Sequence, residues 1–178
     1  MTLSESAHTM LDDWEPSDTD QDQLRKDFLQ HLRTAEDAWS RHCLPDHLTA
    51  SALVVDQSRT KVLLALHRKV GIWLQFGGHI EPDDRTVAEA ALREAFEESG
   101  LSHITLVSSR PLRLDRHAAP CGSGARHHLD IQFLALASSE VQPQASPESE
   151  AVRWFPVNDL PQQTDDALRH LVTAACDA

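Results

Sequence analysis

The sequence predicts a mixed α/β sandwich rather than a doubly wound sheet. The expected elements run in the order helix, strands, one central helix, more strands and a final helix, and the central helix has an alanine-rich face suited to close packing on a sheet. The 178 residues fit one domain that can bury a sizeable core. An apolar content of 40% and a charged content of 25% are those of an ordinary globular protein.

The chain begins with a polar segment followed by a helix. Residues 1–19 are acidic, contain Pro16, and are expected to form a flexible N-terminus. Within residues 20–45, apolar side chains recur at three- and four-residue steps, which predicts a helix from about Asp20 to Cys43. Pro45 bars its continuation. This helix is an addition to the main domain, expected over residues 46–178, and either caps the sandwich or forms a homodimer contact.

Apolar runs rich in Val, Leu and Ala predict the strands. Residues 47–55 and 61–67 should pair as a hairpin around the turn signal Asp56-Gln57-Ser58-Arg59. A third strand, 72–76, is expected to end at a Gly77-Gly78 loop. Later strands are expected at 103–109, 112–116, 128–137 and 151–155, and a closing helix at Thr164–Ala175.

The central helix carries the clearest start and stop signals of the chain. Thr86 is placed to cap it, with Glu89 completing a capping box, and Gly100 suits the left-handed position after its end. At about 100° per residue its two faces differ in character. One face is apolar and the other acidic: Ala88, Ala91, Leu92, Ala95 and Phe96 against Glu94, Glu97 and Glu98.

The acidic face predicts a metal site. Glu94, Glu97 and Glu98 stand at i, i+3 and i+4, where like charges repel one another. A solvated charged face is the ordinary explanation of such residues. However, Arg93 is the one basic residue near them in the sequence, and the double glycine lies where a loop can approach a ligand. A divalent cation is the natural partner of this cluster.

Charge and cysteine content restrict the partners and the compartment. The formal net charge of -12 disfavours bare nucleic acid and anionic membrane surfaces, whereas a small phosphorylated substrate remains compatible if cations neutralise it. Cys43, Cys121 and Cys176 form no CxxC pair, which indicates a reducing compartment rather than a disulfide framework. With no basic leader and no run of membrane-spanning length, the protein is expected to be cytoplasmic.

The segment GGHIEPDDRTVAEAALREAFEESGL, residues 77–101, resembles the signature of the Nudix hydrolases, G-x5-E-x7-R-E-U-x-E-E-x-G-U with U apolar. The second half matches at every defined position, from Arg93 to Leu101. In the first half, Asp84 falls at the acidic position and eight residues rather than seven then precede Arg93. We interpret this as one extra loop residue with Asp84 in place of Glu, although a backward count would put Arg85 there and His79 at the glycine.

The resemblance implies a Nudix-like α/β/α sandwich over about residues 46–175, and an activity. Nudix enzymes hydrolyse a diphosphate bond in a nucleoside diphosphate derivative or nucleoside triphosphate, with Mg²⁺ or Mn²⁺ as cofactor. By resemblance, Arg93 orients Glu97, Asp84 takes the acidic catalytic position, and Glu97, Glu98 or a carboxylate of a later loop is the base. The implied metal ligands are the Gly77 carbonyl, Glu94, Glu97 and Glu98.

Candidate substrate contacts lie near the double glycine and in a later strand. His79 follows Gly78 directly, and either histidine of the pair His127-His128 is placed to hydrogen-bond substrate phosphates together with it. The ordinary alternative is that these histidines lie on the surface or at strand ends. Asp130 is a candidate additional metal ligand or base.

Trp73 is a candidate stacking partner for a base, with core packing as an equally good explanation. Residues 110–127 and 138–150 are expected to determine substrate choice. Two rival functions remain open. One is a nucleotide-sensing Nudix module without turnover, which the complete set of Arg93 and the three glutamates disfavours; the other is an isopentenyl diphosphate isomerase type of activity, for which no matching cysteine is evident.

Overall fold

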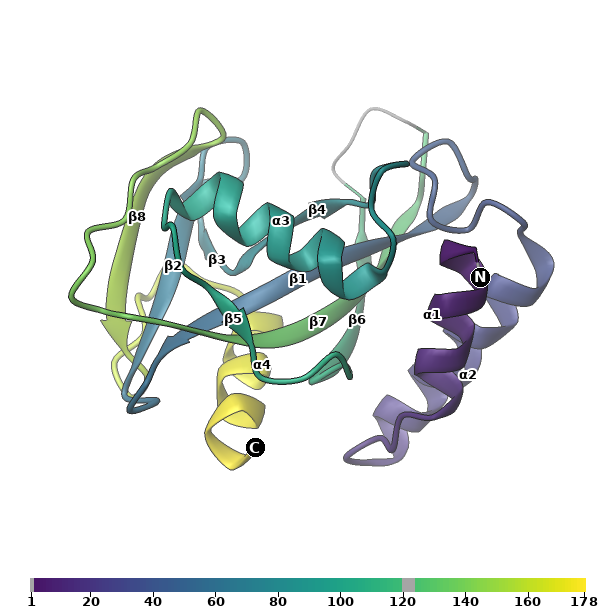
Figure 1. Cartoon of the computed structure of the whole chain (residues 1–178), viewed down its shortest axis with the longest axis horizontal. Coiled ribbons are helices and arrows are strands. Elements are labelled where there is room, and N and C mark those ends of the chain that lie inside the picture. The colour runs from purple at the N-terminus through teal and green to yellow at the C-terminus, as the bar shows by residue number, and fades with distance from the viewer. Residues whose placement is uncertain (1, 120–123) are drawn as a thin grey trace.

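The computed structural model describes residues 2–119 and 124–178, so part of the predicted specificity segment 110–127, with Cys121, lies outside the described residues. Within them the chain forms four helices and eight strands (Figure 1). In chain order these are α1 (Leu3–Asp12), α2 (Thr19–Thr34), β1 (Asp46–Asp56), β2 (Lys61–His67), β3 (Trp73–Leu74), β4 (Phe76–His79), α3 (Val87–Ser99), β5 (Thr105–Leu106), β6 (Arg113–Ala118), β7 (His127–Ala137), β8 (Ser149–Pro156) and α4 (Asp166–Asp177).

A single mixed sheet is built around two long parallel strands. β1 and β7 pair along their whole length, from Asp46 opposite His127 to Asp56 opposite Ala137. All the other pairings are antiparallel: β2 and β4 pair with β1, β3 and β8 pair with β2, and β5 and β6 pair with β7. The predicted β1–β2 hairpin is therefore confirmed.

Helices cover the two faces of this sheet. Alternate residues of β1 point to opposite faces, so Ala50 and Ala52 belong to a core cluster that includes the alanines of α3. Leu53 and Val55 belong to a second cluster that includes Leu168 and Leu171 of α4. Figure 1 shows α3 and α4 on opposite sides of the sheet. The predicted α/β/α sandwich is confirmed.

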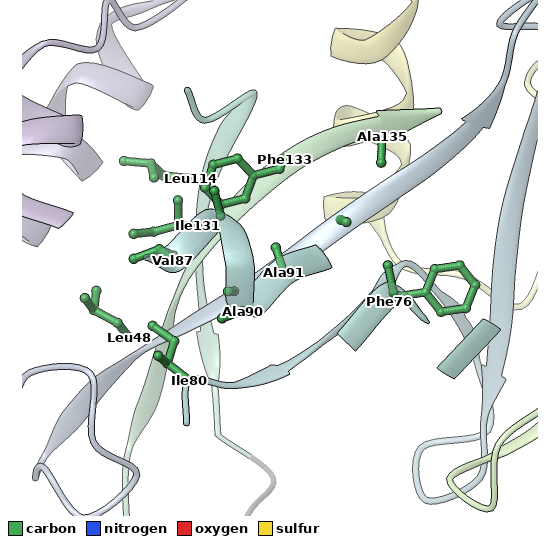
Figure 2. Packing of buried hydrophobic residues seen from close by; sticks show 14 of the residues in the cluster. Leu48, Phe76, Ile80, Val87, Ala90, Ala91, Leu114, Ile131, Phe133 and Ala135 are labelled. Carbon is green, nitrogen blue, oxygen red and sulfur yellow. The ribbon is translucent and has the colours of Figure 1, made fainter. Parts of the chain in front are cut away.

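Small side chains allow α3 to approach the sheet closely. Val87, Ala90 and Ala91 are buried, and Figure 2 shows them beside the aliphatic and aromatic side chains of the sheet. The helix begins and ends as predicted, with Thr86 accepting from the Glu89 amide and Gly100 left-handed at φ 67°. The other half of the predicted capping box is wrong, because the Glu89 carboxylate accepts from the Arg85 amide instead.

The expectation of a flexible segment over residues 1–19 is wrong. Leu3–Asp12 forms α1, which starts with a complete capping box between Thr2 and Glu5. Ala7 and Leu11 are fully buried in the core cluster beneath α3. The acidic composition concealed this short amphipathic stripe, whose stability comes from packing rather than from the helix alone.

Two other boundaries differ from the predictions. α2 ends at Thr34 rather than Cys43, and the buried Ala38 then accepts a 2.8 Å hydrogen bond from the Leu48 amide, which leads the chain into β1. The double glycine belongs to a strand, because Gly77 and Gly78 pair with Ser51 and Ala50 of β1. No helix in the described ranges is long and apolar enough to cross a membrane.

The buried Gln21 of α2 completes the edge of the sheet. Its Nε2 donates to the Leu114 carbonyl at 3.0 Å, and its Oε1 accepts from the Leu114 amide at 2.7 Å. One side chain thereby satisfies the backbone of β6 as a neighbouring strand would. This contact fixes the N-terminal helices against the domain.

We predict that Leu11→Ala lowers the free energy of unfolding by about 2–5 kcal/mol, because it leaves a cavity where α1 packs into the core. Urea unfolding followed by circular dichroism measures this change. Thr9→Ala, at an exposed position of the same helix, is the matched control and should stay within about 0.5 kcal/mol of wild type. Equal stability of both variants would contradict a structural role for α1.

Candidate active site

Arg93 joins the loop after β4 to the acidic face of α3. Its Nε and Nη2 donate to the two carboxylate oxygens of Asp84 at 3.1 and 2.9 Å, and Nη2 also donates to the His79 carbonyl at 3.0 Å. Its Nη1 donates to Glu94 at 2.9 Å and to Glu97 at 3.3 Å. The hydrogen bonds that Arg93 donates to Asp84, and then the one to Glu94, raise the pKa of Arg93 further. A permanent positive charge is therefore held between loop and helix.

The same contacts place Asp84, and not Arg85, at the acidic position of the motif. Asp84 accepts from the Glu81 amide at 2.8 Å, and this turn brings its short side chain within reach of Arg93. Arg85 points away and pairs with Glu89 at 2.6 Å, with 84% of its side chain exposed. The extra residue is thus accommodated in the loop, and the register of α3 is unchanged.

Glu98 is the most perturbed carboxyl of the acidic face. It is 8% exposed, and burial, followed by the charge of Glu94, raises its pKa to about 8, although the Gly77 amide donates to it at 3.3 Å. Burial also raises the pKa of Glu94 despite its pairing with Arg93. Glu97 differs, because 60% of its side chain is exposed. The buried Glu98, the partly buried Glu94 and the exposed Glu97 form a set of oxygen donors whose negative charge is not fully balanced.

The two glycines allow this crowding. A Cβ on Gly78 would lie 2.7 Å from Oε1 of Glu94, and one on Gly77 would lie 2.8 Å from the Ala50 carbonyl. Glycine, which has no side chain, is therefore required at positions 77 and 78, between β1 and the carboxylates. Carboxylate oxygens with raised pKa values and a neighbouring backbone carbonyl fit a hard divalent cation, which would favour their ionised form.

Sequence reasoning did not single out Glu148. It precedes β8, and its charge raises the pKa of both Glu94 and Glu98, which places it near the acidic face. The sequence analysis anticipated a carboxylate from a later loop without naming a residue. No spacing rule identifies it, because non-local contacts bring the loop 138–150 to the site: β8 pairs with β2, and the Gln144 amide donates to the Ser99 carbonyl of α3.

The structure brings His79 and His128 together, with His47 between them in the sheet. His79 pairs opposite Thr49 and His128 opposite His47, so the three rings lie on one face, with centroids 5.0 to 5.3 Å apart. Burial and then the neighbouring imidazoles lower the pKa of His79 to about 4 and of His128 to about 3. Sequence reasoning missed His47. His127, the neighbour of His128 in the sequence, hydrogen-bonds Asp46 instead.

Contacts within the fold account for the positions of Asp130 and Trp73. Asp130 is buried and accepts from the hydroxyls of Thr49 and Ser51 at 2.9 and 2.6 Å and from the Gln132 amide at 3.2 Å. Trp73 is 7% exposed and meets Phe155 edge to face, with ring centroids 4.7 Å apart. Packing therefore accounts for Trp73, and hydrogen bonding accounts for Asp130.

Comparison with known proteins agrees with this site. The family model of the NUDIX domain matches residues 45–175. The chain belongs to the Nudix family and is a Nudix hydrolase. No curated protein matches it in sequence.

Similar solved structures include a Nudix family hydrolase from Clostridium perfringens, at 27% identity and TM-score 0.63, covering 78% of this chain and 97% of that one. A MutT Nudix hydrolase from Burkholderia pseudomallei has 28% identity and TM-score 0.57, covering 72% and 97%. A Caenorhabditis elegans Ap4A hydrolase in a binary complex has 18% identity and TM-score 0.61, covering 73% and 95%. The third likeness concerns the fold alone.

We predict that Glu98 makes the metal-free protein less stable as the pH rises. A buried carboxyl with a raised pKa costs nothing while it is protonated in both states, so the penalty grows from about pH 4.5 to about pH 8 and then levels off. Each pH unit in this window costs up to about 1.4 kcal/mol. Urea unfolding in EDTA should show this decline in wild type and in Glu89→Gln, and a flatter profile in Glu98→Gln. Parallel profiles in wild type and Glu98→Gln would refute it.

Proposed function

We propose that this Nudix hydrolase cleaves a diphosphate bond in a nucleoside diphosphate derivative or a nucleoside triphosphate, with Mg²⁺ as cofactor and Mn²⁺ able to replace it. The observation that carries the proposal is the buried carboxyl of Glu98, its pKa raised to about 8, beside Glu94 and the Arg93 network. Such a group is costly for stability in the free protein and useful when a cation is bound.

The surroundings of each residue suggest its role in binding the cation or in orienting the residues that bind it. Glu94, Glu97, Glu98 and the Gly77 carbonyl would hold the cation. When bound, it would neutralise diphosphate oxygens and lower the pKa of a bound water. Arg93 fixes Glu94 and Glu97 by direct hydrogen bonds, while Asp84 holds Arg93 from the loop side.

Three carboxylates are candidates for the base that accepts the proton of the attacking water. Glu98 is buried, and the Gly77 amide orients it by donating at 3.3 Å. Glu97 is exposed and therefore accessible to a water molecule. Glu148 approaches from the loop before β8. Among these, Glu98 has the surroundings that fit best.

A nucleotide substrate agrees with the remaining features of the protein. The net charge of -12 repels a polyphosphate unless cations screen it, which suits a substrate that arrives as a metal complex. The Gly78 backbone lies beside Glu94 and is a candidate for a substrate contact, whereas His79 and His128 point to the opposite face of the sheet. One structural relative is named for Ap4A, a dinucleoside polyphosphate. We place the activity in the cytoplasm, as the composition indicates.

A mixed panel of nucleoside triphosphates, nucleotide sugars and dinucleoside polyphosphates tests the proposal. Incubation with Mg²⁺ in ¹⁸O-labelled water, followed by mass spectrometry of the products, identifies both the substrate and the phosphorus attacked. Product formation that requires the divalent cation is expected. Tight binding of a panel member without turnover would instead support a sensing module.

We predict that Glu98→Gln lowers kcat at least about 100-fold on the best substrate, because it replaces the candidate base and charged ligand with a neutral amide. Glu97→Gln should cause a loss of similar order. Glu89→Gln, on the same helix but paired with the exposed Arg85, is the matched control and should keep near wild-type activity. Wild-type turnover by Glu98→Gln would contradict the assignment.

A further inference from the structure

A cluster of imidazoles lies on the sheet face opposite the carboxylates of α3. One ring nitrogen from each of His47, His79 and His128 lies within 4.8 Å of the other two. The three residues come from β1, β4 and β7, and β1 pairs directly with both of the other strands. Rigid paired strands therefore hold the three side chains, rather than loops.

The hydrogen bonding of the cluster is incomplete. Among residues 2–119 and 124–178, no hydrogen bond of normal geometry satisfies either ring nitrogen of His47 or Nε2 of His79, although all three atoms are buried. The Cys43 backbone lies near enough to His47 to raise its pKa, but this contact does not meet normal hydrogen-bond geometry. His47 is 0% exposed, so bulk solvent does not reach its ring nitrogens. Buried polar atoms are nearly always paired, and unpaired ones indicate a missing water, ion or ligand. Three such atoms at one place point to a ligand that accepts nitrogen lone pairs.

We propose that His47, His79 and His128 form a binding site for a transition-metal ion of the Zn²⁺ class, distinct from the oxygen site on α3. Neutral imidazoles suit Zn²⁺ and its neighbours, whereas Mg²⁺ prefers oxygen. Ligands at about 2.0–2.1 Å in a tetrahedral zinc site stand roughly 3.3 Å apart, so small side-chain rotations would close the cluster. Three protein ligands leave a fourth position for water or a substrate atom.

Two neighbouring groups lie outside this set of nitrogen ligands. His117 meets His128 edge to face, with ring centroids 5.3 Å apart, but it is not among the residues whose ligand atoms lie within 4.8 Å of one another. Asp130 lies opposite Thr49 in the sheet and uses its oxygens on Thr49, Ser51 and Gln132. The site is therefore made of nitrogen donors, which distinguishes it from the acidic face.

Simple ring packing is the alternative explanation. The centroid separations of 5.0 to 5.3 Å are those of ordinary aromatic contacts. Packing alone, however, would be served equally well by apolar side chains, which carry no nitrogens to satisfy. The unpaired nitrogens of His47 and His79 favour the metal.

The test uses the full chain after treatment with EDTA and buffer exchange, with Co²⁺ as the optical probe. We expect visible d–d absorption that saturates near about one equivalent, is abolished by Zn²⁺ and survives a large excess of Mg²⁺. His79→Gln and His128→Gln should lose this absorption. His103→Gln, at an exposed position, should retain it.

A double variant separates this site from the acidic face. Glu94→Gln/Glu97→Gln should keep the Co²⁺ absorption, because it leaves all three imidazoles in place. Loss of the band in this variant together with its persistence in His79→Gln would overturn the proposal. So would the absence of saturable Co²⁺ absorption in folded wild-type protein.

X-ray absorption of the Zn²⁺-loaded wild type needs no variant, and so remains decisive if a histidine substitution prevents folding. Imidazole scattering from about three nitrogen ligands supports the site. A shell made mainly of oxygen, without imidazole scattering, overturns it.

Discussion

The guanidinium group of Arg93 holds the loop after β4 against the acidic face of α3. It binds both oxygens of Asp84 and the His79 carbonyl on the loop side, and Glu94 and Glu97 on the helix side. Without this charge the carboxylates of α3 would repel one another, and nothing of equal strength would fix the loop against the helix. Two of the four proposed metal ligands, Glu94 and Glu97, are therefore held directly by one partly buried ion network.

The sheet positions this ion network and separates a group of oxygen donors from a group of nitrogen donors. Along β4, Gly78 faces Glu94 while His79 points to the opposite face, because successive residues of a strand alternate. Oxygen donors thus gather on the α3 side, and the nitrogens of His47, His79 and His128 gather on the other. One short strand contributes to both, and its backbone pairing with β1 fixes them relative to each other.

Local signals made much of the fold predictable. Thr86 and Gly100 bracket α3, and the spacing of its alanines and glutamates identified both faces. Non-local pairing was not predictable in the same way. His47 meets His128 only because β1 and β7 run parallel in one particular register, and Glu148 arrives through the register of β8 on β2. The helix α1 was hidden because its few apolar residues gain stability only in the core.

The central claim is that the acidic face of α3 holds a divalent cation, and Mn²⁺ binding followed by electron paramagnetic resonance tests it most directly. Wild type and Glu89→Gln should remove Mn²⁺ from the free signal with equal affinity. Glu94→Gln/Glu97→Gln should bind at least about tenfold more weakly, because two charged oxygen ligands are lost. Equal Mn²⁺ affinity in the double variant and wild type would contradict the account.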